Sequence, residues 1–209
     1  MINPLILAGH KLLEYQIMYD AYQNCVGSVM YRRKLVTSLV PKGFNSFLDI
    51  GCGTASTVDL LPGNASYIGV DISQKYLQKA VSRRPDLTLI QGDISKQDWL
   101  DSANIAEPTM CIALGIYHHL DDYQLNNMLD NCISILPLGS QIFSMDPVIV
   151  SSTSRGSKWF AENDRGKFVR TPDKLDKILT SKGLKVELFT KKNEMRIPLD
   201  TVEIMATRE

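Results

Sequence analysis

The chain has 209 residues, of which 44% are hydrophobic, and this length can enclose one sizeable core with modest additions. Lysine and arginine number 23, as do aspartate and glutamate, so no net charge favours nucleic acid or an acidic membrane surface as a partner. No run approaches the ~20 apolar residues of a membrane-spanning helix. We therefore expect one domain over residues 1–209, without nucleic-acid or membrane partners.

Alternating apolar elements follow an N-terminal helical region. Residues 5–39 have helix-like spacing with a break at Gly27–Ser28, which predicts two helices before the first strand. Beyond Pro41 the pattern predicts strands at 46–51, 67–71, 87–93, 110–116 and 141–145, helices at 74–84 and 122–136, and a loosely helical stretch near Trp99. Strands that alternate with helices form a parallel sheet covered on both faces.

The C-terminal part has a different pattern. The polar stretch 151–170 contains three aromatic residues, which favours an ordered lid or substrate-side insertion over a free linker. A helix at 173–182 and strands at 185–190 and 201–207 follow it. We divide the domain into a helical cap (1–40), a core (44–148), the insertion (151–170) and a closing helix and strand pair (171–209).

The first strand runs directly into Gly51-Cys52-Gly53. Glycine lets the backbone approach a ligand, and the carboxyl edge of a parallel sheet is where open α/β folds bind nucleotides. Asp71 ends the next strand, and a carboxylate there can accept hydrogen bonds from both ribose hydroxyls. A ligand-free turn is the alternative, and Asp71 argues against it. A nicotinamide dinucleotide fits less well, because Ser56 stands where its fingerprint has glycine or alanine.

The run from Leu48 to Thr54 resembles the glycine motif of the class I S-adenosylmethionine-dependent methyltransferases, and the resemblance extends over residues 44–148. It implies a Rossmann-like, doubly wound α/β sheet of about seven strands, mostly parallel with an antiparallel C-terminal strand. It also implies S-adenosylmethionine as cofactor. The implied cofactor-binding residues are Asp71 at the ribose, Ile72, Asp93 and Ile94 at the adenine, Asp49, Gly51, Cys52 and Gly53 along the methionine part, and Leu114 and Gly115 near the donor methyl group.

Two of these acids have structural alternatives. Asp93 could cap the stretch that begins at Ile94, and Asp49 could accept hydrogen bonds from turn amides. Three acids at successive strand ends nevertheless lie on the same edge of a parallel sheet, which favours a shared ligand.

His118 and His119 follow the fourth strand. Adjacent side chains tend to point apart, so we expect no metal site. Methyl transfer needs a general base only when the acceptor is a hydroxyl or a protonated amine. His118 is the first candidate for that base and Asp146 the second, although Asp146 precedes Pro147 and could be a turn residue.

Candidate acceptor contacts are Tyr22, Tyr117, Arg165 and Arg170. The two arginines could clamp a carboxylate, phosphate or acidic sugar. Alternatively, Arg165 could pair internally with Glu162, Asp164 or Asp173, or the arginines could simply be solvated. Tyr22 could cover the cofactor or pack in the core. Residues 163–172, together with Met195–Pro198, are similar to a methyltransferase subgroup linked to bacterial surface-polysaccharide and secondary-metabolite functions.

The four cysteines lack C-x-x-C spacing, and the N-terminus lacks the basic region and cleavage site of a signal peptide, so we expect reduced thiols and a cytoplasmic enzyme. The predicted function is methyl transfer from S-adenosylmethionine to a small polar acceptor, a small-molecule substrate, by O- or N-methylation. A binding module that kept the cofactor but lost catalysis, acting as a sensor or partner, is the alternative. An NAD-binding oxidoreductase fits less well.

Overall fold

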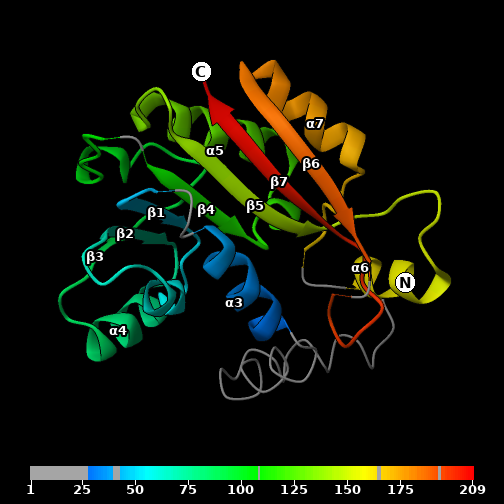
Figure 1. Cartoon of the computed structure of the whole chain (residues 1–209), viewed down its shortest axis with the longest axis horizontal. Coiled ribbons are helices and arrows are strands. Elements are labelled where there is room, and N and C mark those ends of the chain that lie inside the picture. The colour runs from blue at the N-terminus through cyan, green and yellow to red at the C-terminus, as the bar shows by residue number, and fades with distance from the viewer. Residues whose placement is uncertain (1–27, 40–42, 108, 164–165, 193) are drawn as a thin grey trace.

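Seven strands form one twisted sheet in the order β3-β2-β1-β4-β5-β7-β6 (Figure 1). The computed structural model describes residues 28–39, 43–107, 109–163, 166–192 and 194–209. The strands are β1 (Ser46–Ile50), β2 (Ser66–Asp71), β3 (Thr88–Gln91), β4 (Met110–Leu114), β5 (Gln141–Pro147), β6 (Leu184–Lys191) and β7 (Thr201–Arg208). Strand β7 is antiparallel to both β5 and β6, and the other neighbouring pairs are parallel. The expected fold class is confirmed.

Two apolar clusters cover the two faces of this sheet. Helices α5 (Asp122–Ile135) and α7 (Pro172–Ser181) bury leucine, methionine and cysteine side chains on one face. Helices α3 (Ser28–Leu39) and α4 (Gln74–Arg83) contribute to the other cluster. All five residues of β1 are buried, as expected for a central strand of a sheet covered on both sides. This arrangement leaves the strand ends as the accessible edges.

Local capping explains where the helices begin. Asp121 and Gln124 form a reciprocal capping box at α5, Ser73 caps α4, and Thr171 caps α7 with a proline in its first turn. Each cap satisfies an amide that has no partner within the helix. The helices predicted at 74–84, 122–136 and 173–182 are confirmed to within one residue at each end.

Three connections differ from the prediction. After β1 the chain forms a short 3-10 helix, η2 (Ser56–Leu60), and near Trp99 it forms only η3 (Leu100–Ser102). Trp99 is fully buried, and a Cβ added at Gly92 would lie 2.6 Å from its Cβ, so this connection is anchored by one large side chain instead of a helical face. The polar stretch 151–170 contains a helix that periodicity missed, α6 (Arg155–Asn163).

Helix α6 lies at the end of the sheet where β6 ends and β7 begins (Figure 1). The Ser157 hydroxyl accepts a hydrogen bond from the Asp200 amide at 2.9 Å, and Thr153 donates to the Asp200 carboxylate at 2.7 Å. These contacts join the 151–163 segment to the β6–β7 connection. Of the two predicted N-terminal helices, α3 is confirmed and the first lies outside the described residues. Within the described chain, no helix combines the length and apolarity needed to cross a bilayer.

Candidate functional site

The glycine turn lies where β1 ends, on the same edge as the ends of β2, β4 and β5. Gly51 and Gly53 have φ values of 68° and 56°, which favour glycine. The amides of Gly51 and Cys52 both donate to the Val70 carbonyl, which fixes the turn against β2. A Cβ at Gly51 would lie 2.2 Å from Ile116, whereas one at Gly53 would meet no atom within 4 Å. Gly53 therefore presents bare backbone to open space.

Asp71 joins this turn to the end of β2. Its Oδ2 accepts from the Gly53 amide at 2.8 Å and its Oδ1 from the Ser73 amide at 2.7 Å. Each carboxylate oxygen can accept more than one hydrogen bond, so Asp71 retains acceptor capacity for a diol. Ile72 beside it is 67% exposed, which is an unusual position for a large apolar side chain unless a ligand covers it.

Asp93 follows β3 on the same edge. Its Oδ1 accepts from the Ser95 amide at 3.0 Å and from the Ser95 hydroxyl at 2.7 Å, in the local turn that the capping alternative implied. Partial burial acts to raise the pKa of Asp93, but the Ser95 hydrogen bonds and Lys96 outweigh it and lower the pKa. Ile94 packs against the larger apolar cluster. Asp93 is thus an ionised acceptor, and its second oxygen, Oδ2, lies 3.5 Å from Lys96 Nζ.

Asp49 is buried within β1 and does not cap turn amides. Its Oδ2 accepts from the Tyr67 hydroxyl at 2.7 Å. Burial raises the pKa of Asp49 to about 6, while hydrogen bonds from Tyr67 and Thr57 and the Arg32 charge act in the opposite direction. The side chain of Cys52 also points inward, because a Cβ at Gly69 would lie 2.8 Å from its Sγ. Cys52 could therefore contact a ligand through its backbone.

The two candidate bases form one unit. His118 lies in η4 (Tyr117–His119), and its Nδ1 is 2.7 Å from Oδ1 of Asp146 on β5. The same Oδ1 accepts from the His118 amide at 3.1 Å. The side chains are 7% and 2% exposed. Asp146 pairs with Val202 inside the sheet, so the turn interpretation of Asp146 is wrong.

The His118 ring is held between two glycines. A Cβ at Gly166 would lie 1.8 Å from Cδ2, and a Cβ at Gly115 would lie 3.7 Å from Cε1. Nε2 lies between these two carbon atoms, so this edge of the ring borders the end of β4 at Gly115. The His118 and His119 rings lie 4.2 Å apart, so the expectation that they point apart is wrong. Within the described residues, no three His, Cys, Asp or Glu side chains cluster as metal ligands would.

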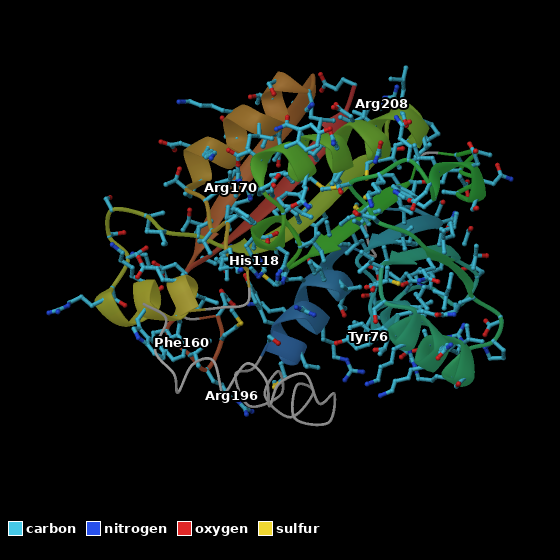
Figure 2. All side chains as sticks on the ribbon, turned by 180° about the vertical axis from the view of Figure 1, so that it is seen from behind. Tyr76, His118, Phe160, Arg170, Arg196 and Arg208 are labelled. Carbon is cyan, nitrogen blue, oxygen red and sulfur yellow. The ribbon has the colours of Figure 1, made fainter. Side chains whose placement is uncertain are left out.

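Arg170 is a structural residue. Its guanidinium donates to the carbonyls of Tyr117 at 2.7 Å and Leu120 at 2.7 Å and to the Asp122 carboxylate at 2.9 Å, and its side chain is 3% exposed. Figure 2 shows Arg170 and His118 close together beside α5, with Tyr76 well apart on α4. The predicted acceptor contact is therefore wrong, because the guanidinium is bound inside the protein, with Asp122 as its ion-pair partner.

Tyr117 is also wrongly predicted as an acceptor contact. It is 1% exposed and packs in the larger apolar cluster beneath α5. Tyr22 and Arg165 lie outside the described residues.

Sequence reasoning missed Arg32 on α3, because only the fold brings this helix to the ends of β1 and β4. A Cβ at Gly115 would lie 3.2 Å from Arg32 Nη2.

A surface hollow of about 520 Å³ lies elsewhere, near the starts of β2 and β3. Its charged lining residues Arg84, Asp86 and Asp59 pair with one another, and it contains none of the candidate residues. The edge formed by the strand ends therefore remains the candidate site.

Comparisons with known proteins concern the kind of domain and its fold. Residues 47–139 match the family model described as a methyltransferase domain. No curated protein matches the chain in sequence. The fold is similar to that of a SAM-dependent methyltransferase from Archaeoglobus fulgidus, with a TM-score of 0.70 and 19% identity over 92% of this chain and 100% of that one.

Two further solved structures are similar. The plantazolicin methyltransferase BpumL, solved with a triazolic desmethylPZN analog and SAH, has a TM-score of 0.71 and 13% identity over 98% of this chain and 95% of that one. Human N-acetylserotonin methyltransferase, in complex with SAM, has a TM-score of 0.66 and 16% identity over 87% of this chain and 52% of that one. At these identities the likeness concerns the fold.

Proposed function

We propose that the chain is a class I S-adenosylmethionine-dependent methyltransferase that methylates a hydroxyl or amino group of a small polar acceptor. The observation that carries the proposal is the 2.7 Å contact between His118 and Asp146, at the same sheet edge as the glycine turn and Asp71. A paired imidazole at this edge is useful to an acceptor that must lose a proton.

The residues at this edge fit the donor. Gly53 leaves its backbone uncovered, as a cofactor that lies against the turn requires. Asp71 offers acceptor oxygens to the ribose hydroxyls, and exposed Ile72 offers an apolar surface to the adenine. The donor supplies an electrophilic methyl group on a sulfonium.

Gly115 and His118 border the space where we propose that the acceptor lies. With its Nδ1 proton directed at Asp146, the His118 imidazole would take the acceptor's proton at Nε2. Asp146 then stabilises the imidazolium and keeps the ring in this orientation, as a buried carboxylate does in other catalytic pairs. The burial of both side chains excludes bulk water from the transfer.

Two observations support a small acceptor. The chain carries no net charge, which argues against a polyanionic substrate. The similar plantazolicin methyltransferase BpumL was solved in complex with a triazolic desmethylPZN analog and SAH.

The test is an assay with S-adenosylmethionine and a panel of phenols, sugars, amines and carboxylates, read by mass spectrometry for the gain of one methylene. With any acceptor that reacts, His118→Asn should lower kcat roughly 10²–10⁴-fold, the range for a lost general base, while donor affinity stays within about twofold. His119→Asn is the matched control, because the neighbouring ring is exposed.

Three other results of this assay would contradict the proposal. Equal activity of His118→Asn and wild type would refute the base. Donor binding without methylation of any acceptor would favour the inactive binding module, and binding of a nicotinamide dinucleotide in place of the donor would overturn the function.

A further inference from the structure

The backbone is strained at Ala55, two residues after the glycine turn. Among the described residues other than glycine, Ala55 alone has a positive φ, 52°, which with a ψ of 36° is left-handed helical backbone. This conformation costs free energy in any residue with a Cβ, because the Cβ approaches the following carbonyl oxygen. Ala55 is fully buried, and its amide donates to the Cys52 carbonyl at 2.8 Å. The strain therefore lies in the same bend that uncovers the backbone of Gly53.

A side chain from another element holds this bend. Arg83 is the last residue of α4, and its Nη2 donates to the Thr54 carbonyl at 3.0 Å and to the Ala55 carbonyl at 2.9 Å. Its Nη1 pairs with Asp59 in η2. The two carbonyls belong to the peptide groups on either side of the Ala55 Cα, so their common donor restricts both backbone angles of Ala55. We call these two hydrogen bonds the Arg83 clamp.

The other end of α4 is fixed to Asp71. Ser73 caps the helix, and its amide donates to Asp71 Oδ1 at 2.7 Å. The second oxygen, Oδ2, accepts from the Gly53 amide at 2.8 Å. Helix α4 therefore connects with the glycine turn twice, through Asp71 at its start and through Arg83 at its end.

We propose that Arg83 is a positioning residue for donor binding, an inference that rests on the proposed function. The clamp keeps Ala55 in the left-handed conformation and thereby keeps the turn Gly51–Gly53 in the shape that the donor meets. Without the clamp, Ala55 relaxes in part of the population, and the fraction of protein that can bind the donor falls. Glycine at position 55 adopts the same conformation without the penalty, so it makes the clamp unnecessary.

Calorimetry with S-adenosylhomocysteine, the demethylated form of the donor, tests this role without any acceptor. Arg83→Met should weaken binding roughly 5- to 30-fold, the population ratio that the left-handed penalty of an L-residue corresponds to. Adding Ala55→Gly to Arg83→Met should restore the affinity to within about threefold of wild type, because the bend then needs no clamp. Ala55→Gly alone should change the affinity less than about twofold, since the clamp is intact.

Arg84→Met is the matched control. The Arg84 side chain is 38% exposed against 39% for Arg83, and it shares the ion-pair partner Asp59. Its guanidinium otherwise binds the Asp86 carboxylate and not the turn carbonyls. Arg84→Met should bind S-adenosylhomocysteine as wild type does, because exposed ion pairs contribute little.

Amide hydrogen exchange in the free protein measures the bend without a ligand. The amides of residues 51–55 should exchange several-fold faster in Arg83→Met than in wild type, because local opening exposes them. The variant that also carries Ala55→Gly should return to the wild-type rate. A general loss of stability would speed exchange in both variants, so the return separates positioning from a merely structural role.

Wild-type affinity in a folded Arg83→Met protein would overturn the role of the clamp. An equal loss in Arg84→Met, or a double variant that stays as weak as Arg83→Met, would also overturn it, and the proposed function would stand in all three cases. A wild-type protein that binds no S-adenosylhomocysteine would overturn the proposed function, and hydrogen exchange alone would then decide whether Arg83 holds the bend.

Discussion

Burial gives the side chains of Asp49 and Tyr117 roles that differ from the ligand contacts their motifs predict. Both belong to motifs whose pattern suggested contact with a ligand, yet 4% of Asp49 and 1% of Tyr117 is exposed. The buried Asp49 carboxyl is held by Tyr67 and faces Arg32, so its effect on the site is electrostatic. Tyr117 contributes its ring to the core.

The titration of Asp49 gives a prediction about stability. The pKa of its carboxyl is about 6 in the folded protein against an ordinary 3.8, so the folded state binds more protons between these values and stability falls as pH rises through them. Asp49→Asn should therefore gain about 2 kcal/mol over wild type between pH 4 and pH 7. Urea unfolding of both proteins at pH 4 and pH 7 measures this difference in the free energy of unfolding. If that free energy changed equally with pH in both proteins, the Asp49 carboxyl would be solvated and the prediction would be wrong.

The hydroxyl of Tyr117 provides a second residue-scale prediction. It is buried without a hydrogen-bond partner among the described residues, whereas the Tyr67 hydroxyl donates to Asp49. Tyr117→Phe should leave the free energy of unfolding unchanged or raise it, because it removes an unsatisfied group. Tyr67→Phe, the matched control, should lose roughly 1–3 kcal/mol. A comparable loss in both variants, measured by urea unfolding, would contradict the assignment of Tyr117.

Helices and loops at the site are joined by side chains that bridge distant segments. Arg170 connects its own segment to η4 and to the start of α5, and three of its four acceptors are backbone carbonyls. Gly166 packs on the His118 ring from the same segment. The 166–170 stretch thus encloses the His118–Asp146 pair, which is a positioning role and not acceptor recognition.

A comparison of two cations tests this role. Arg170 and Lys174 both contact Asp122, and the pKa of Asp122 is lowered by Lys174 first and Arg170 second. Arg170→Met should lower the free energy of unfolding by roughly 2–4 kcal/mol, because it leaves buried carbonyls unpaired. Lys174→Met, which is half-exposed, should cost less than about 1 kcal/mol. If thermal or urea unfolding gave similar losses of stability for the two variants, water would satisfy the carbonyls that Arg170 contacts, and the prediction would be wrong.

At the scale of the whole molecule, the sheet order decides which residues meet. Strands β4 and β5 are neighbours, so His118 beyond β4 reaches Asp146, which lies 28 residues away in the chain. Strand β1 lies between β2 and β4, which aligns Asp71, the glycine turn and Gly115 along one edge. Helix α3 covers the face beside them and brings Arg32 to that edge.

The sequence by itself determined the alternation of strands and helices, the turn at Gly51–Gly53 and the acids that end successive strands. These features are local, because periodicity, caps and glycine geometry act over a few residues. Only the tertiary structure decided that His118 and Asp146 form a pair, that Arg170 and Tyr117 are internal and that Arg32 faces Gly115. Those outcomes depend on contacts between segments far apart in the chain, and on burial, which no short pattern of residues encodes.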